Sequence, residues 1–191
     1  LKKPDGKYMD YSEAVAAGKP LKYVGKFSVP GVACDEKGQG RPFVVYMYGV
    51  FMAEVSVNTE TGKVEVDKMT LMADIGKVNN RLVTDGQIYG GMAQGIGLAL
   101  LEDFEDIKKH SNLVGAGFPF AKDITDNMEI VYFENYPREF GPFGTAGVGE
   151  LPLSSPHAAI GNAIYNACGV RVHRLPALPE RILAGFKGQK V

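Results

Sequence analysis

The most constraining stretch of the sequence is a pair of apolar runs joined by a short polar turn. Both runs, within residues 42–76, are rich in β-branched and aromatic residues, and Asn58-Thr-Glu-Thr-Gly62 lies between them. This pattern predicts two antiparallel strands connected as a hairpin. The period-two alternation makes four valines face one another across the pair, Val55 and Val57 against Val64 and Val66. The fold is therefore expected to contain a sheet built around this hairpin.

Further segments predict helices and strands on either side of the hairpin. A short helix is expected at Tyr11–Ala17 and a strand at residues 21–30. A turn at residues 78–86 leads into a helix over residues 87–106, and residues 127–136 predict another strand.

Two more helices are predicted to begin at prolines. The first has Ser155 as its N-cap, Pro156 at its first position and Gly169 after its end. The second lies within residues 175–188. The predicted fold class is α+β, with a mostly antiparallel sheet and two to three helices packed against it.

The composition argues against several kinds of protein. Of the 191 residues, 45% are hydrophobic and 23% are charged, which is typical of a globular chain. The net charge is −1 and the basic residues form no cluster, so no nucleic-acid partner is expected. No apolar run approaches the roughly 20 residues that span a bilayer, and the N-terminus lacks a signal-peptide pattern, so no membrane partner is expected.

The two cysteines, Cys34 and Cys168, lie far apart in the sequence. A disulfide between them is possible, but two buried thiols in a reducing compartment are favoured, which indicates a cytoplasmic location. Two cysteines are too few for a four-cysteine iron–sulfur site in this chain.

The helix predicted at residues 87–101 has two contrasting faces. Four apolar residues form a core stripe on one face: Ile88, Met92, Ile96 and Ala99. The other face carries Gln94 among glycines, namely Gly90, Gly91 and Gly97. Each glycine inside a helix costs about 0.5–1 kcal/mol relative to alanine, so bare backbone here indicates that something approaches closely. Tight packing against another element is one explanation, and a flat polar ligand that hydrogen-bonds Gln94 is the other.

A second glycine-rich segment ends at a single acid. Four glycines fall within residues 140–150, and Glu150 follows the last of them, ahead of Leu151 and Leu153. Apolar neighbours predict a partly desolvated carboxylate, and desolvation raises a carboxylate pKa toward the range in which it serves as a base. The alternative is a glutamate that caps a helix or forms a salt bridge.

Taken together, the two glycine segments resemble a known family. DGQIYGGMAQGIGLALLEDF at residues 85–104, followed by GPFGTAGVGELPLSSPHAAIGNAI at residues 141–164, is similar to the end of the molybdenum-binding subunit of the xanthine oxidase/aldehyde oxidoreductase family. The likeness runs through residues 41–55, 62–76, 113–120 and 174–180, and is close to the bacterial aldehyde oxidoreductases that carry molybdopterin cytosine dinucleotide.

The resemblance implies roles for particular residues. Glu150, in the G-V-G-E motif, is implied to be the active-site base that takes a proton from a metal-bound water or hydroxide. Gln94 and Gly95 are implied to contact the pterin, and the loop residues implied to bind the cofactor are Gly147, Val148 and Gly149. Molybdenum is implied to be held by the pterin dithiolene, with no protein ligand to the metal and Glu150 nearby.

The resemblance also implies what this chain lacks. Members of the family are several times longer and carry 2Fe-2S clusters in other domains or subunits. Residues 1–191 are therefore expected to be the C-terminal portion of the molybdopterin-binding domain, inactive alone and partnered by the rest of a dimeric enzyme. The expected substrates are aldehydes or aromatic heterocycles. An alternative from another class is a non-catalytic assembly module that binds a partner protein.

The remaining candidates have weaker signals. His110 follows a basic pair and is expected to be exposed, whereas His173 is expected to be structural. His157, in the first turn of the Pro156 helix, is a candidate to support the Glu150 loop. Residues 115–120 are a candidate lining of the cofactor channel.

Overall fold

The computed structural model describes residues 5–8, 10–18, 22, 24–26, 28 and 33–191. The chain divides into two compact units, Leu1–Val44 and Val45–Val191. The first unit contains α1 (Tyr11–Ala16), as predicted, and the carboxylate of Asp10 caps this helix by accepting the Ser12 N–H at 2.8 Å. The predicted strand at residues 21–30 lies mainly outside the described residues.

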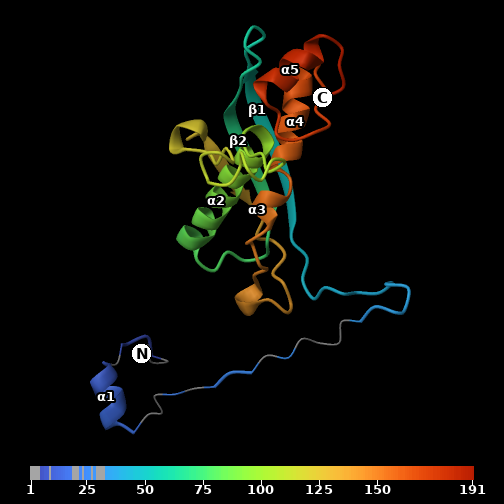
Figure 1. Cartoon of the computed structure of the whole chain (residues 1–191). Helices are drawn as coiled ribbons and strands as arrows, with labels where there is room; N and C mark the ends of the chain where they lie inside the picture. Colours follow the sequence, from blue (N-terminus) through green and yellow to red (C-terminus); the bar gives the residue numbers. More distant parts are fainter. Residues whose placement is uncertain (1–4, 9, 19–21, 23, 27, 29–32) are drawn as a thin grey trace. The chain divides into compact units, whose positions relative to one another are not determined.

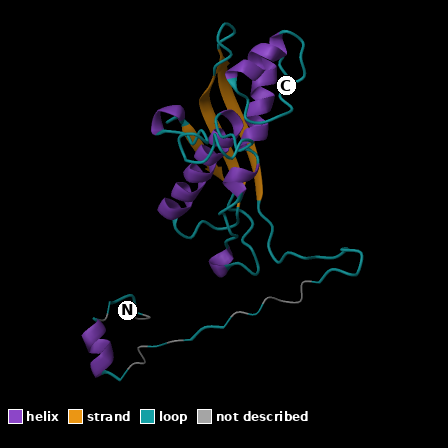
Figure 2. Ribbon diagram, viewed as in Figure 1, coloured by secondary structure: helices purple, strands orange, loops and turns teal. Residues whose placement is uncertain are grey.

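The second unit is built on a three-stranded sheet in the order β1-β2-β3 (Figure 2). β1 (Tyr48–Val57) and β2 (Val64–Asp74) form the predicted antiparallel hairpin, and the four valines pair as expected, Val55 with Val66 and Val57 with Val64. β3 (Met128–Tyr132) pairs with β2 in parallel, over five residue pairs against ten in the hairpin. The sheet is therefore mostly antiparallel.

Four helices belong to this unit: α2 (Arg81–Leu100), α3 (Leu151–Ser154), α4 (Pro156–Cys168) and α5 (Pro179–Phe186). Two short 3-10 turns, Ala121–Asp123 and Pro142–Gly144, lie in the connections. Figure 1 shows α4 and α5 beside the hairpin, and α4 contacts β1. The structure thus confirms the α+β class with helices packed on a sheet.

Two details of the helices differ from the sequence predictions. α2 begins at Arg81, inside the segment predicted as a turn, because the Asn80 side chain accepts the Val83 N–H at 3.2 Å and caps the helix there. It ends at Leu100, before the predicted end at residue 106. Ser155 occupies the N-cap position of α4, but its side chain makes no capping hydrogen bond to the part of the chain that the structure describes.

The other predicted helix ends are present in the structure. Gly169 ends α4 in the left-handed conformation with φ 76°, and its N–H donates to the Tyr165 carbonyl at 2.8 Å.

A side-chain hydrogen bond connects the N-terminal part of α2 to β3. The Tyr132 hydroxyl donates to the Asp85 carboxylate at 2.7 Å. Burial and this bond to Asp85 raise the pKa of Tyr132.

The core lies between the sheet and the helices. Its fully buried side chains come from β2, α2, α4 and α5: Met69, Leu71, Ile88, Met92, Ile96, Ile160, Ile164 and Ile182. The predicted α2 stripe of Ile88, Met92, Ile96 and Ala99 is completely buried. On β1 the alternate residues Tyr48, Val50 and Met52 are exposed, so the other face of this strand carries uncovered apolar side chains.

The two cysteines are free thiols, but they are not buried as predicted. Cys34 is exposed, and Cys168 is half-buried with its Sγ 3.2 Å from the Ile164 carbonyl oxygen, to which it donates. Among the helices of the described ranges, none has the length and apolar character needed to cross a membrane.

Candidate functional site

The two glycine segments of the sequence meet where α2 passes the start of α3 and α4. A Cβ added to Gly91 would lie 2.6 Å from the Pro152 Cβ, and one added to Gly95 would lie 2.6 Å from the Pro156 Cγ. Both distances are too short for real atoms, so glycine is what allows α2 to pack this closely. This contact fixes the Gln94 segment and the Glu150 segment side by side.

A second set of glycines in the same two segments faces open space. At Gly90 on α2, and at Gly147 and Gly149 in the loop, an added Cβ would have no described heavy atom within 4 Å. The backbone conformations of these three glycines have no positive φ. Neither the backbone conformation nor contact with a described atom therefore requires glycine at these positions.

The two polar candidates, Gln94 and Glu150, lie next to these contacts. Gln94 is exposed on α2, one residue before the packed Gly95. Its amide has no hydrogen-bond partner within the described ranges, although it can donate two hydrogen bonds and accept others. The prediction that Gln94 needs partners from elsewhere remains open.

Glu150 is presented at the start of α3. Its backbone lies in the helical region, with φ −99° and ψ −19°, and its carbonyl accepts from the Leu153 and Ser154 N–H groups at 3.1 and 3.2 Å. Its carboxylate caps no helix and forms no ion pair with a described residue, so the capping and salt-bridge alternatives find no support. The side chain is exposed, so this chain alone does not supply the desolvation predicted from its apolar neighbours.

The base of the glycine loop is held by Arg138, which sequence reasoning did not single out. Its side chain is 15% exposed and binds Asp74 on β2, with Nη2 2.6 Å from the carboxylate oxygen. The guanidinium also donates to the backbone carbonyls of Tyr46, Asp74 and Tyr136 at 3.0–3.1 Å. The Arg138 N–H donates to the Gly144 carbonyl at 2.8 Å. This one residue therefore connects the loop, β2 and the segment before β1.

Backbone bonds complete the attachment of the loop. The Gly144 carbonyl accepts a second bond, from the Lys77 N–H at 2.9 Å, and the Ala146 N–H donates to the Ile75 carbonyl at 2.7 Å. Gly76 adopts φ 72° and lies so close to the Gly144 carbonyl that a side chain there would overlap with it. The loop leading to Glu150 is thus fixed at its first half and open around Gly147 and Gly149.

Phe143 is the other residue that the sequence did not reveal. It adopts φ 54°, the only described non-glycine residue with positive φ, and 90% of its surface is exposed. A bulky residue in this conformation is strained, and such strain gathers at functional sites. No pattern in the sequence distinguishes it from the other phenylalanines.

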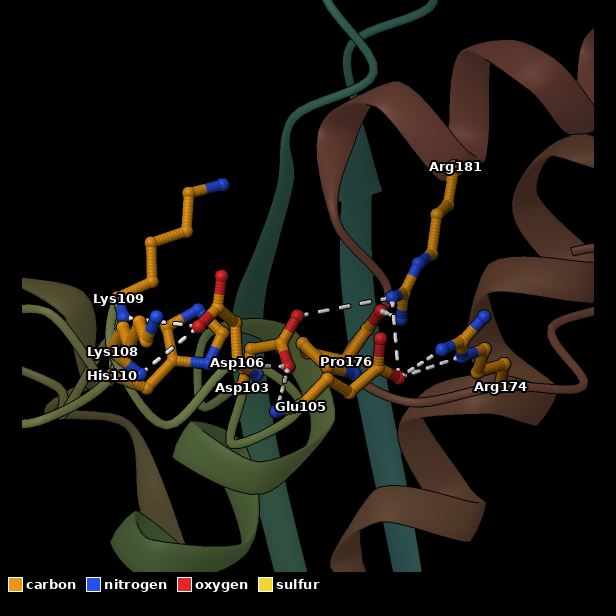
Figure 3. Close-up of polar contacts among 9 residues, drawn as sticks. All are labelled: Asp103, Glu105, Asp106, Lys108, Lys109, His110, Arg174, Pro176 and Arg181. Atoms are coloured by element: carbon orange, nitrogen blue, oxygen red, sulfur yellow. Dashed lines mark hydrogen bonds and ion pairs between the residues drawn. The ribbon is translucent and has the colours of Figure 1, made fainter.

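Two weaker candidates, His110 and His173, form no hydrogen bond or ion pair with Glu150. His110 is half-buried, not exposed as predicted, and its Nδ1 accepts the Asp106 N–H at 3.2 Å and lies 3.7 Å from the Asp103 carboxylate (Figure 3). His173 is exposed, and its backbone N–H donates to the Val191 carbonyl. In the loop at residues 115–120, Gly117 packs on the Leu101 carbonyl at the end of α2.

Val148 is half-buried against the core between the two open glycines. No group of three or more His, Cys, Asp or Glu side chains is placed to hold a metal ion in the parts of the chain that the structure describes. The candidate site therefore offers the uncovered backbone of the open glycines, the amide of Gln94 and the carboxylate of Glu150.

Comparison with known proteins supplies a context for this arrangement. The family described as molybdopterin cofactor-binding domain matches residues 2–125. The aldehyde oxidoreductase of Megalodesulfovibrio gigas is 64% identical over 187 residues, which cover 97% of this chain and 20% of that protein. The 6-hydroxypseudooxynicotine dehydrogenase complex subunit gamma of Paenarthrobacter nicotinovorans is 32% identical over 92% of this chain and 23% of its own length.

Solved structures agree with these matches. The aldehyde oxidoreductase from Desulfovibrio gigas superposes with a TM-score of 0.85 at 63% identity, over 97% of this chain and 21% of that one. The aldehyde oxidoreductase from Desulfovibrio desulfuricans gives a TM-score of 0.83 at 58% identity, over 96% and 20%. The chain spans about a fifth of the length of these relatives. It belongs to the molybdopterin cofactor-binding domain family, within the xanthine oxidase/aldehyde oxidoreductase group of molybdenum proteins.

Proposed function

We propose that this chain is the C-terminal part of a molybdenum hydroxylase in which Glu150 is the general base. The observation that carries this proposal is the carboxylate of Glu150, which has no partner among described residues and follows two glycines with open space around them. The rest of the subunit, which relatives carry in the other four-fifths of their length, would enclose this carboxylate and supply the missing desolvation.

The residues present fit a pterin cofactor. Open backbone at Gly90, Gly147 and Gly149 admits a flat ligand at close range, because no described atom occupies the space that a side chain would fill. Gln94 supplies an amide that both donates and accepts, which matches the donor and acceptor groups of a pterin ring. Gly95 is buried against Pro156, so a cofactor contact there would involve its backbone and not the face that Pro156 covers.

The roles of the protein residues follow from this arrangement. When bound, the molybdenum cofactor supplies the redox chemistry that oxidises the substrate carbon. Glu150 accepts a proton at one carboxylate oxygen, Gln94 orients the cofactor, and Val148 with its flanking glycines keeps the loop close to the ligand. Arg138 holds the base of the loop, so that the position of Glu150 does not depend on the bound cofactor alone.

The finer points of the proposal extend the resemblance of the sequence to the molybdenum hydroxylase family. We propose the cytosine dinucleotide form of the cofactor, 2Fe-2S clusters in the rest of the enzyme, and an aldehyde or aromatic heterocycle as substrate. Partner domains or subunits complete the site, the complete enzyme is dimeric and cytoplasmic, and this chain alone is inactive.

The test is Glu150→Gln in the complete enzyme, because glutamine keeps the size of the side chain but cannot accept the proton. We expect turnover to fall about a hundredfold to ten-thousandfold, with molybdenum content unchanged. Glu139→Gln is the matched control, since Glu139 is an exposed glutamate of the same segment. Near-normal turnover in Glu150→Gln would remove the assignment of the base.

A further inference from the structure

Just beyond the end of α2 lies a glutamate that is mostly buried as a residue and whose carboxylate has no partner among the described residues. Glu102 is only 8% exposed, and its side chain forms no hydrogen bond or ion pair with any residue in the described ranges. Burial raises the pKa of this carboxyl group. Its oxygens keep some contact with solvent, since they are not among the fully buried side-chain atoms that lack a partner. Anything that covers them and excludes this water would have to compensate the negative charge.

A second residue that lines the same cavity also carries an unpaired polar atom. Glu102 and His157 both line a hollow of about 380 Å³, closed on its apolar side by Leu98, Leu175 and Pro176. The His157 Nδ1 is the one buried side-chain nitrogen or oxygen without a hydrogen-bond partner in the described part of the chain. An imidazole nitrogen can accept an N–H, as can a carboxylate. Two acceptors on residues that line this cavity, Glu102 just after α2 and His157 in α4, therefore lack a donor among the described residues.

Two arginines contact the other acids that line this cavity. Figure 3 shows Arg174 and Arg181 reaching the other two acids of the cavity, Asp103 and Glu105. Arg174 binds Glu105, and Arg181 lies 3.9 Å from each acid while donating to the Pro176 carbonyl at 2.8 Å. These contacts offset the negative charges of Asp103 and Glu105, but they leave the Glu102 carboxylate without a partner among the described residues.

We propose that this cavity receives the N–H groups of a lysine or arginine side chain from the part of the molybdenum subunit outside this chain, with Glu102 and His157 as the acceptors. This assembly contact rests on the proposed function, which makes the chain one piece of a longer subunit. A basic side chain satisfies a carboxylate and an imidazole nitrogen together. The four-fifths of each relative that this chain does not span provide its source. The described acids and histidines are not grouped as metal ligands, which favours a nitrogen cation over a metal ion.

The test compares Glu102→Gln with the wild type by thermal melting of the complete enzyme. Removing one partner of a buried ion pair is strongly destabilising, whereas removing an unpaired buried charge is neutral or stabilising. We therefore expect the melting temperature to fall by several degrees in Glu102→Gln. Glu105→Gln is the control, because Glu105 lines the same cavity but is half-exposed and paired with Arg174, and exposed pairs contribute little. Equal or higher melting of Glu102→Gln would overturn the proposal.

Two further arms identify the source of the cation and the role of His157. The first arm uses a buffer whose only cation is tetramethylammonium, which has no N–H to donate. If the donor is a side chain of the enzyme, the melting temperature of Glu102→Gln stays below that of the wild type in this buffer. If the two melting temperatures differ only after methylammonium or sodium is added, the cation comes from solution, which would overturn the assignment to a side chain. His157→Asn keeps an acceptor near the Nδ1 position and should melt like the wild type, whereas His157→Leu should melt lower. Equal melting of these two variants would remove His157 from the site. Turnover is not the readout, so failure here leaves the Glu150 assignment intact.

Discussion

Two groups of glycines in neighbouring segments perform opposite tasks. Gly91 and Gly95 lie against prolines at the start of α3 and α4, and any side chain there would collide with them. Gly90 and Gly147 have no described atom in the space that a side chain would occupy. The first group holds the two motifs together, and the second leaves backbone uncovered. The comparison shows that a glycine-rich motif needs its neighbours before it can be assigned to packing or to ligand binding.

The packed group should show the largest effect on stability. In Gly91→Ala the new methyl group meets the Pro152 ring at 2.6 Å, and a proline ring cannot rotate away. We expect a loss of about 3 kcal/mol or more, the upper range for overpacking, measured by denaturant unfolding. Gly161→Ala on α4 is the control, because an added Cβ there has no described neighbour. If Gly91→Ala is as stable as the wild type, the distinction between glycines required for packing and glycines that leave backbone uncovered would be wrong.

Removing Arg138 should have an intermediate effect. Arg138→Met leaves the partly buried Asp74 carboxylate unpaired and breaks the bonds to three backbone carbonyls. We expect a loss of about 2 kcal/mol, together with a lower kcat at unchanged molybdenum content, because the loop that carries Glu150 loses its attachment. Arg138→Lys keeps the charge but loses the planar guanidinium with its several N–H donors. It should therefore recover only part of the lost stability and part of the lost kcat. Unchanged kcat in the methionine variant would contradict a positioning role for Arg138.

Gln94 should have the smallest effect on stability and a visible one on the cofactor. Because the side chain is exposed and makes no bond within the described part of the chain, Gln94→Ala should leave unfolding within about 0.5 kcal/mol of the wild type. Molybdenum content, measured by elemental analysis, should fall, whereas the pH profile of the remaining activity should not change. Gln189→Ala, an exposed glutamine after α5, is the control. A full molybdenum complement in Gln94→Ala would count against the contact.

Local patterns in the sequence predicted most of the fold. Alternation determined the hairpin, including the pairing of Val55 with Val66, and helical periodicity identified the buried side of α2. The parallel pairing of β3 with β2 was not predicted, because local alternation does not say which distant segment will be the neighbour. The N-terminus of α2 was missed because an asparagine cap lay inside a segment that reads as a turn.

The site was predictable only as a pair of motifs. The glycine-rich patterns singled out Glu150 and Gln94, and the resemblance to the molybdenum hydroxylases supplied their expected roles. The helical wheel placed Gly90 and Gly91 together beside Gln94, whereas the structure exposes Gly90 and buries Gly91. Arg138 was missed because its partners lie more than sixty residues earlier in the chain, at Asp74 and Tyr46.

The most direct test of the account is the molybdenum content of the complete enzyme carrying Gly147→Ala or Gly149→Ala. Neither position has a positive φ or a described neighbour, so the chain itself should tolerate a methyl group there and keep its melting temperature. If the uncovered backbone is where the cofactor lies, the methyl group takes its space and molybdenum content should fall well below that of the wild type. Full molybdenum content with normal turnover in both variants would contradict the account.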